Sequence, residues 1–109
     1  MMAWLMGVPG LSPAQLQQRL QQGDLSLIDV NSAPPRQGLI PGARWIDPTQ
    51  LGPQDLPTNR DQTLVFYCAN PFCRKAPRAA RQARQWGHTD VAVLAAGIEG
   101  WQRAGLPLS

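Results

Sequence analysis

The sequence predicts a three-layer α/β/α fold in which a mainly parallel central sheet of about five short strands lies between helices. Apolar runs of strand length alternate with helical patterns across short connections, which is typical of a sheet covered by helices on both faces. The strongest run, residues 63–67, is β-branched and aromatic and has no charge, as in a central parallel strand. With 109 residues, we expect a single domain over residues 1–109.

The chain opens with an apolar segment, residues 1–10, which has no basic leader and is too short to span a membrane. We expect it to be a leading arm or strand that packs on the core, and we expect no association with membranes. The pair Ser12–Pro13 is typical of a helix start, and Gly23 of a helix end. These signals predict a helix over residues 13–22.

The next elements are short. Residues 25–30 form an apolar run that predicts a buried strand. Residues 31–42 hold three prolines and two glycines, and therefore predict a loop. A second short strand is expected at residues 43–46. One helical turn is expected at residues 48–51, before another loop that contains proline.

The second half of the chain predicts two helices and one strand after the strand at 63–67. Residues 77–86 have small apolar residues and a tryptophan on one face and arginines on the other, so we expect a helix opened by Pro77. Residues 90–94 predict a strand. Residues 98–104 predict a final helix with Trp101 facing the core, and a glycine follows each of these helices.

The chain has two cysteines, five positions apart, at the end of the central strand and in the loop that follows. A thiol in this place, before a helix N-terminus, is suited to hold a thiolate and to meet an anion. Cys68 and Cys73 are too few for a secreted disulfide scaffold, so we expect a reducing, cytoplasmic location. His88, the one histidine, is expected at the surface, and we expect no metal site.

Basic residues gather directly after the cysteines. The net charge is only +3, yet five of the ten lysines and arginines lie between positions 74 and 84, with no acidic residue among them. An anion that approaches the cysteines therefore meets positive charge first. The segment lacks interleaved aromatic residues, so we expect no nucleic-acid partner.

Five short segments carry a resemblance to a known family when they are taken together and in order. They are Leu27-Ile28-Asp29-Val30, Gly38 to Ala43, Val65-Phe66-Tyr67-Cys68, Leu94 to Trp101 and Gly105-Leu106-Pro107. In this order and spacing they resemble the single-domain rhodanese-like (sulfurtransferase) family over nearly the whole chain. The resemblance implies a parallel sheet wrapped by helices.

The resemblance also implies an activity. Sulfurtransferases of this family carry sulfane sulfur as a persulfide on the cysteine that follows the central strand, and Cys68 matches that position. The implied reaction takes sulfur from thiosulfate or a persulfide and passes it to cyanide, a thiol or a protein, without a cofactor. An acidic protein donor or acceptor could dock on the face formed by Arg78 and Arg81. The residues expected to bind substrate are Ala69, Asn70, Phe72, Cys73, Arg74 and Lys75.

Two questions stay open at the level of the sequence. The loop from Cys68 to Arg74 has seven residues and no glycine, so it also resembles the Cys-x5-Arg loop of rhodanese-fold phosphatases and arsenate reductases. A non-catalytic binding module is the third alternative. Cys73 is either a resolving thiol for an oxidised or persulfidated Cys68, or a bystander that packs under the loop.

Overall fold

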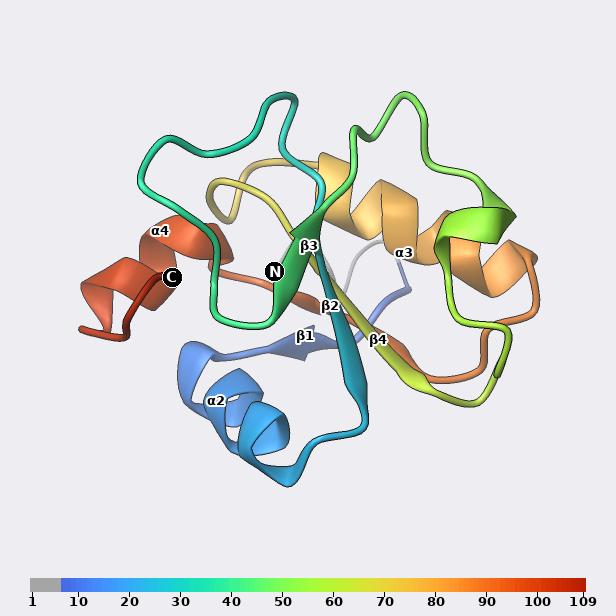
Figure 1. Cartoon of the computed structure of the whole chain (residues 1–109), viewed down its shortest axis with the longest axis horizontal. Helices are drawn as coiled ribbons and strands as arrows, with labels where there is room; N and C mark the ends of the chain where they lie inside the picture. Colours follow the sequence, from blue (N-terminus) through green and yellow to red (C-terminus); the bar gives the residue numbers. More distant parts are fainter. Residues whose placement is uncertain (1–6) are drawn as a thin grey trace.

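The computed structural model describes residues 7–109 and contains one parallel sheet of five strands. The order across the sheet is β1-β5-β4-β2-β3, so β4 lies at its centre (Figure 1). The α/β fold with a parallel sheet is thus confirmed. The strands are β1 (Gly10–Leu11), β2 (Leu25–Asp29), β3 (Ala43–Trp45), β4 (Thr63–Tyr67) and β5 (Val91–Leu94).

Helices cover both faces of the sheet (Figure 1). Residues of α3 pack on one face, while residues of α2 and α4 pack on the other. The predicted start of α2 is confirmed, because Ser12 and Gln15 exchange side-chain and backbone hydrogen bonds as a capping box. The helices are α2 (Pro13–Gln22), α3 (Lys75–Gln85), α4 (Gly97–Arg103) and the short 3-10 helix η1 (Pro53–Asp55).

Strand β4 divides the core between these two layers. Leu64, Phe66 and then Cys68 face the α3 layer, whereas Val65 and Tyr67 face α2 and α4. This alternation is the two-residue period of a strand, and every one of these side chains is buried. The cysteine after β4 therefore continues the row of side chains that α3 covers.

The limits of some elements differ from the predictions. Helix α3 begins at Lys75 rather than Pro77, because a proline within the first helical turn loses no intrahelical hydrogen bond. Residues 48–50 form a turn, so the helical turn expected at 48–51 is absent there and lies later, in η1. There the Asp55 carboxylate accepts a hydrogen bond from the Gly52 N–H and so holds the start of η1.

His88 is not at the surface as expected, because it is only 4 % exposed. Its backbone N–H donates to the Ala83 carbonyl at 3.1 Å, while Gly87 takes a positive φ of 98°. This is the Schellman arrangement of a helix end, and it folds the chain back over the last turn of α3. The prediction failed because the side chain follows a backbone reversal that the residue types alone do not reveal.

The predicted leading arm lies partly outside the described residues, which begin at residue 7. Within the described part, Val8 is buried, and Gly10–Leu11 pair in parallel with Val93–Leu94 at the edge of the sheet. No helix in residues 7–109 is both long and apolar enough to cross a membrane.

Helix α4 begins in close contact with the backbone that follows Cys68, which leads to a first prediction. Gly97 has a φ of 68°, and a Cβ built on it would lie 2.5 Å from the Asn70 nitrogen and 2.6 Å from the Ala69 carbonyl carbon. Gly105 has a similar φ of 79° but has open space around its Cα. We expect Gly105→Ala to cost about 1–2 kcal/mol through backbone strain alone. We expect Gly97→Ala to cost about 1–3 kcal/mol more, because it also displaces backbone.

Urea unfolding of both variants measures this difference. Equal losses of stability in the two variants would contradict the close contact between Gly97 and the loop.

Candidate active site

Cys68 lies where the central strand ends, with 2 % of its surface exposed. The carboxyl end of a parallel strand is the usual place for a ligand site in an open α/β sheet. The Cys68 thiol donates a hydrogen bond to the backbone carbonyl of Cys73, with 3.5 Å between sulfur and oxygen. The loop thus folds back so that its second cysteine lies against the first.

Asn70 organises this loop. Its side-chain Oδ1 accepts a hydrogen bond from the Phe72 N–H at 2.9 Å, and its backbone carbonyl accepts one from the Cys73 N–H at 3.2 Å. Pro71 has no N–H to offer. Two backbone donors of the loop are therefore used within the loop itself. Sequence reasoning missed this role, although an asparagine in a turn is the known signal for such a side-chain cap.

Two backbone N–H groups hydrogen-bond the Cys68 sulfur, those of Ala69 and Ala76. Ala76 lies in the first turn of α3, so the start of that helix supplies one of the donors. Burial, together with the hydrogen bond to the Cys73 thiol, nevertheless raises the pKa of Cys68 to about 12. The amides act in the opposite direction but do not compensate for the loss of water.

The pKa of Cys73 moves the other way. Burial alone would raise it, but the hydrogen bond from Cys68, the N–H groups of Lys75 and Ala69 and the charge of Lys75 together lower it. The two thiols interact strongly enough to titrate as a pair. The first proton therefore leaves the outer sulfur, that of Cys73, while Cys68 keeps its proton.

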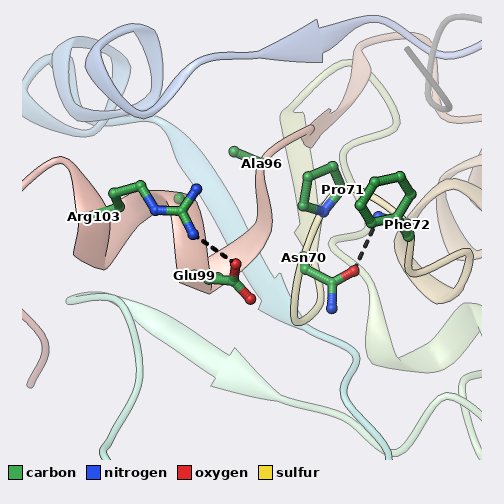
Figure 2. Close-up of a pocket in the computed structure, with 7 residues that line it drawn as sticks. Asn70, Pro71, Phe72, Ala96, Glu99 and Arg103 are labelled. Atoms are coloured by element: carbon green, nitrogen blue, oxygen red, sulfur yellow. Dashed lines mark hydrogen bonds and ion pairs between the residues drawn. The ribbon is translucent and has the colours of Figure 1, made fainter.

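Two cavities adjoin the loop, and the smaller one is lined by both cysteines. The small one, of about 10 Å³, has room for roughly one water-sized group. The larger one is a groove of about 410 Å³ that runs between the loop and α4, where Glu99 and Arg103 form an ion pair at 2.9 Å (Figure 2). Asn70 and Pro71 line both cavities. The other residues of the small cavity are Cys68, Cys73, Ala76, Pro77, Val93, Leu94 and Ala95.

The remaining residues predicted for the site surround the pair at different depths. Phe72 is 81 % exposed at the tip of the loop, on the rim of the groove (Figure 2). Arg74 is exposed at the N-cap of α3, and its side chain does not cap the helix. Lys75 is half-buried, and its charge acts on Cys73.

The arginine face of α3 carries unpaired charge. Arg78 and Arg81 are both exposed. Among the described residues, the two ion pairs are Arg19 with Asp90 and Arg103 with Glu99. Neither pair involves a basic side chain of α3, so the helix presents positive charge to solvent beside the cysteines.

A buried carboxylate holds the neighbouring strand end. Asp29 is the last residue of β2 and is paired with Tyr67 of β4. Its carboxylate accepts hydrogen bonds from the Asn31 N–H at 2.8 Å and from the Asn31 side-chain amide at 2.9 Å. The Tyr67 hydroxyl in turn accepts a hydrogen bond from the Ile40 N–H at 3.2 Å. These hydrogen bonds give Asp29 a structural role, because they fix the start of the loop at 31–42.

Comparisons with known proteins bear on this geometry. The chain is 35% identical over 99 residues to an HTH-type transcriptional regulator of Mycobacterium tuberculosis, matching 90% of this chain and 43% of the relative. It is 32% identical over 98 residues to an uncharacterized protein of Synechocystis, matching 89% and 54%. The chain therefore spans about half the length of the curated relatives it matches.

Solved structures of sulfur-transferring proteins have the same fold. The 3-mercaptopyruvate sulfotransferase SseA from Escherichia coli is 26% identical with a TM-score of 0.74, over 94% of this chain and 50% of that one. A thiosulfate sulfurtransferase from Pseudomonas aeruginosa is 25% identical with a TM-score of 0.77, over 92% and 19%. The family model of the rhodanese-like domain matches residues 12–104. The chain belongs to the rhodanese-like domain family.

Proposed function

We propose that the protein is a sulfurtransferase that carries sulfane sulfur as a persulfide on Cys68. The observation that carries this proposal is the position of Cys68 at the end of the central strand, in hydrogen-bond contact with a second thiol and with the Ala69 and Ala76 amides. The donor is thiosulfate or a persulfide, and the acceptor is cyanide, a thiol or a protein. Two free thiols in one loop suit a reducing compartment such as the cytoplasm.

The first half-reaction requires Cys68 as a thiolate. The Cys73 thiol, which has the lower pKa of the pair, loses its proton first, and the resulting Cys73 thiolate accepts the proton of Cys68 as Cys68 attacks. The Cys68 thiolate then attacks the outer sulfur of thiosulfate, the S–S bond of the donor breaks, and sulfite leaves with the bonding electron pair. The product is a persulfide anion on Cys68, toward which the Ala69 and Ala76 amides point as donors.

The second half-reaction returns the enzyme to its starting state. The acceptor attacks the outer sulfur of the persulfide, and Cys68 leaves as a thiolate. We assign the approach of both substrates to the groove beside α4, because the small cavity next to the thiols has little free volume. The proposal assigns substrate contacts to Ala69, Asn70, Phe72, Cys73, Arg74 and Lys75.

Phosphatase or arsenate reductase chemistry is the second candidate, favoured by the seven-residue loop from Cys68 to Arg74. A tetrahedral oxyanion needs several converging donors. The Phe72 and Cys73 amides are instead hydrogen-bonded to Asn70, and Pro71 has none. This arrangement supports sulfur transfer over phosphate or arsenate chemistry. The third candidate is a binding module without catalysis.

We predict that thiosulfate adds one sulfur atom, about 32 Da, to the reduced protein, and that Cys68→Ser abolishes the gain. Intact-mass spectrometry measures the gain, and cyanide should remove it because the added sulfur is sulfane. Cys68→Ser is nearly isosteric, so its thermal unfolding serves as the folding control.

Turnover of an aryl phosphate with no mass gain would instead favour the phosphatase candidate. Inertness in both assays would leave the binding module.

Lys75 should control the reactivity of the thiol pair. Its positive charge lowers the pKa of Cys73, so removing that charge in Lys75→Met should raise this pKa. Less thiolate is then present at neutral pH, and the pH profile of iodoacetamide alkylation should move to higher pH. Because burial holds the pKa of Cys68 at about 12, we expect Cys73 to be alkylated first.

Arg78→Met is the matched control, since Arg78 lies on the exposed side of the same helix. An equal displacement of the profile in both variants would contradict a local effect of Lys75.

The arginine face of α3 is proposed as the docking surface for an acidic protein donor or acceptor. Persulfide transfer to a cysteine peptide flanked by glutamates should be faster than transfer to one flanked by lysines, and salt should remove the advantage. Arg78→Gln should reduce this preference, whereas Arg36→Gln, an exposed arginine of another loop, should retain it. Stopped-flow transfer rates measure both, and an unchanged preference in Arg78→Gln would exclude this face.

A further inference from the structure

The close pairing of the two thiols has a chemical consequence beyond sulfur transfer to an outside acceptor. Cys73 lies in hydrogen-bond contact with the Cys68 sulfur, and both side chains line the same small cavity. The chain has no third cysteine. A sulfur atom loaded on Cys68 therefore has a nucleophile beside it within the same loop.

We propose that Cys73 resolves the Cys68 persulfide, releasing hydrosulfide and leaving a Cys68–Cys73 disulfide that an external dithiol reduces. This inference rests on the proposed persulfide chemistry of Cys68. It adds a second outcome for the bound sulfur, namely reduction to sulfide rather than transfer as sulfane sulfur.

The step balances in atoms and electrons. The Cys73 thiol, which holds the one proton of the pair, gives this proton to the outer sulfur of the persulfide anion. The resulting Cys73 thiolate attacks the inner sulfur, the Cys68 Sγ, and forms the bond between the two cysteines. The bond from Cys68 Sγ to the outer sulfur breaks, and the outer sulfur leaves with the electron pair as hydrosulfide. The two cysteine sulfurs are oxidised to a disulfide, while the sulfane sulfur is reduced. A dithiol such as dithiothreitol then reduces the disulfide and restores both thiols.

The geometry favours attack on the inner sulfur. Cys73 contacts the Cys68 sulfur directly, and the backbone carbonyl oxygen of Cys73 lies 3.5 Å from that sulfur. The small cavity offers room for roughly one water-sized group, which suits the departing sulfur. A disulfide needs the sulfur atoms at about 2.05 Å, so the loop must bring the Cys73 sulfur within bonding distance of the Cys68 sulfur.

Asn70 is the positioning residue for this step. Its side chain and carbonyl hold the Phe72 and Cys73 N–H groups, which turns the chain back toward Cys68. Phe72 at the tip of the loop is exposed and does not pack in the core. The turn can therefore move Cys73 toward Cys68 without repacking the interior. The lowered pKa of Cys73 supplies thiolate for the attack.

A single-turnover experiment without reductant tests the inference. Reduced, desalted protein receives one equivalent of thiosulfate under anaerobic conditions, and sulfite, sulfide and intact mass are followed. We expect the wild type to release sulfite and then sulfide, while its mass passes from a gain of about 32 Da to a loss of about 2 Da. Non-reducing digestion should find Cys68 joined to Cys73, at a rate independent of protein concentration.

The variants separate the steps. Cys73→Ser should retain the mass gain and release sulfide at least about tenfold more slowly, because no thiolate attacks the inner sulfur. Asn70→Ala should slow the decay of persulfide once it has formed, and Asn70→Asp should restore the decay because its carboxylate also accepts the Phe72 N–H. This rescue distinguishes positioning of Cys73 from a general loss of structure.

Each contrary outcome has a distinct meaning. If wild type and Cys73→Ser keep the added sulfur equally long, the inference is wrong while the proposed function stands. If the added sulfur maps to Cys73, the proposed persulfide on Cys68 and the inference are both wrong. If the wild type yields neither sulfite nor a mass gain, the proposed function fails and the inference fails with it.

Discussion

The first turn of α4 fixes the point at which the central strand becomes a loop. The Ile98 and Glu99 N–H groups donate to the carbonyls of Cys68 and Ala69 at 2.9 and 3.0 Å. Gly97 allows this contact because any side chain there would strike the backbone of Ala69 and Asn70. The backbone after β4 is therefore held by a helix far along the chain, and the thiol keeps its position beneath α3. The groove, the turn at Asn70 and the pairing of the cysteines all depend on this attachment.

The electrostatics of the site follow from two thiols that lie together in a nearly dry place. One buried thiol with two amide donors would remain protonated at neutral pH, because burial outweighs those donors. A second, less buried thiol beside a lysine changes this balance, since the pair needs to lose only one proton to provide an anion. The negative charge can then move between the sulfur atoms without a change in the charge of the loop. The first turn of α3 supports both positions of the charge.

Much of the architecture could be predicted from local patterns. Apolar runs and helix caps predict β4, α2 and α4 within about one or two residues, because their burial and their sequence period agree. The position of Cys68 follows from the end of β4. An asparagine in a turn signals a side-chain cap, but the N–H groups that it binds depend on how Asn70 turns in three dimensions. The commitment of both the Phe72 and the Cys73 amides to Asn70 therefore could not be predicted. The prediction that His88 is exposed was wrong for a similar reason, because a backbone reversal at the end of α3 determines its burial.

The use of loop amides within the loop also bears on which anions the site can hold. A compact, highly charged oxyanion requires many donors to replace its water, and this loop commits the Phe72 and Cys73 donors to Asn70. A persulfide carries a single charge on large, polarizable sulfur and needs fewer donors. The Ala69 and Ala76 amides and the charge of Lys75 supply this smaller number of stabilising interactions. In the proposed function, the extra length of the loop serves sulfur chemistry rather than the binding of a tetrahedral oxyanion, because it brings a second thiol beside the first.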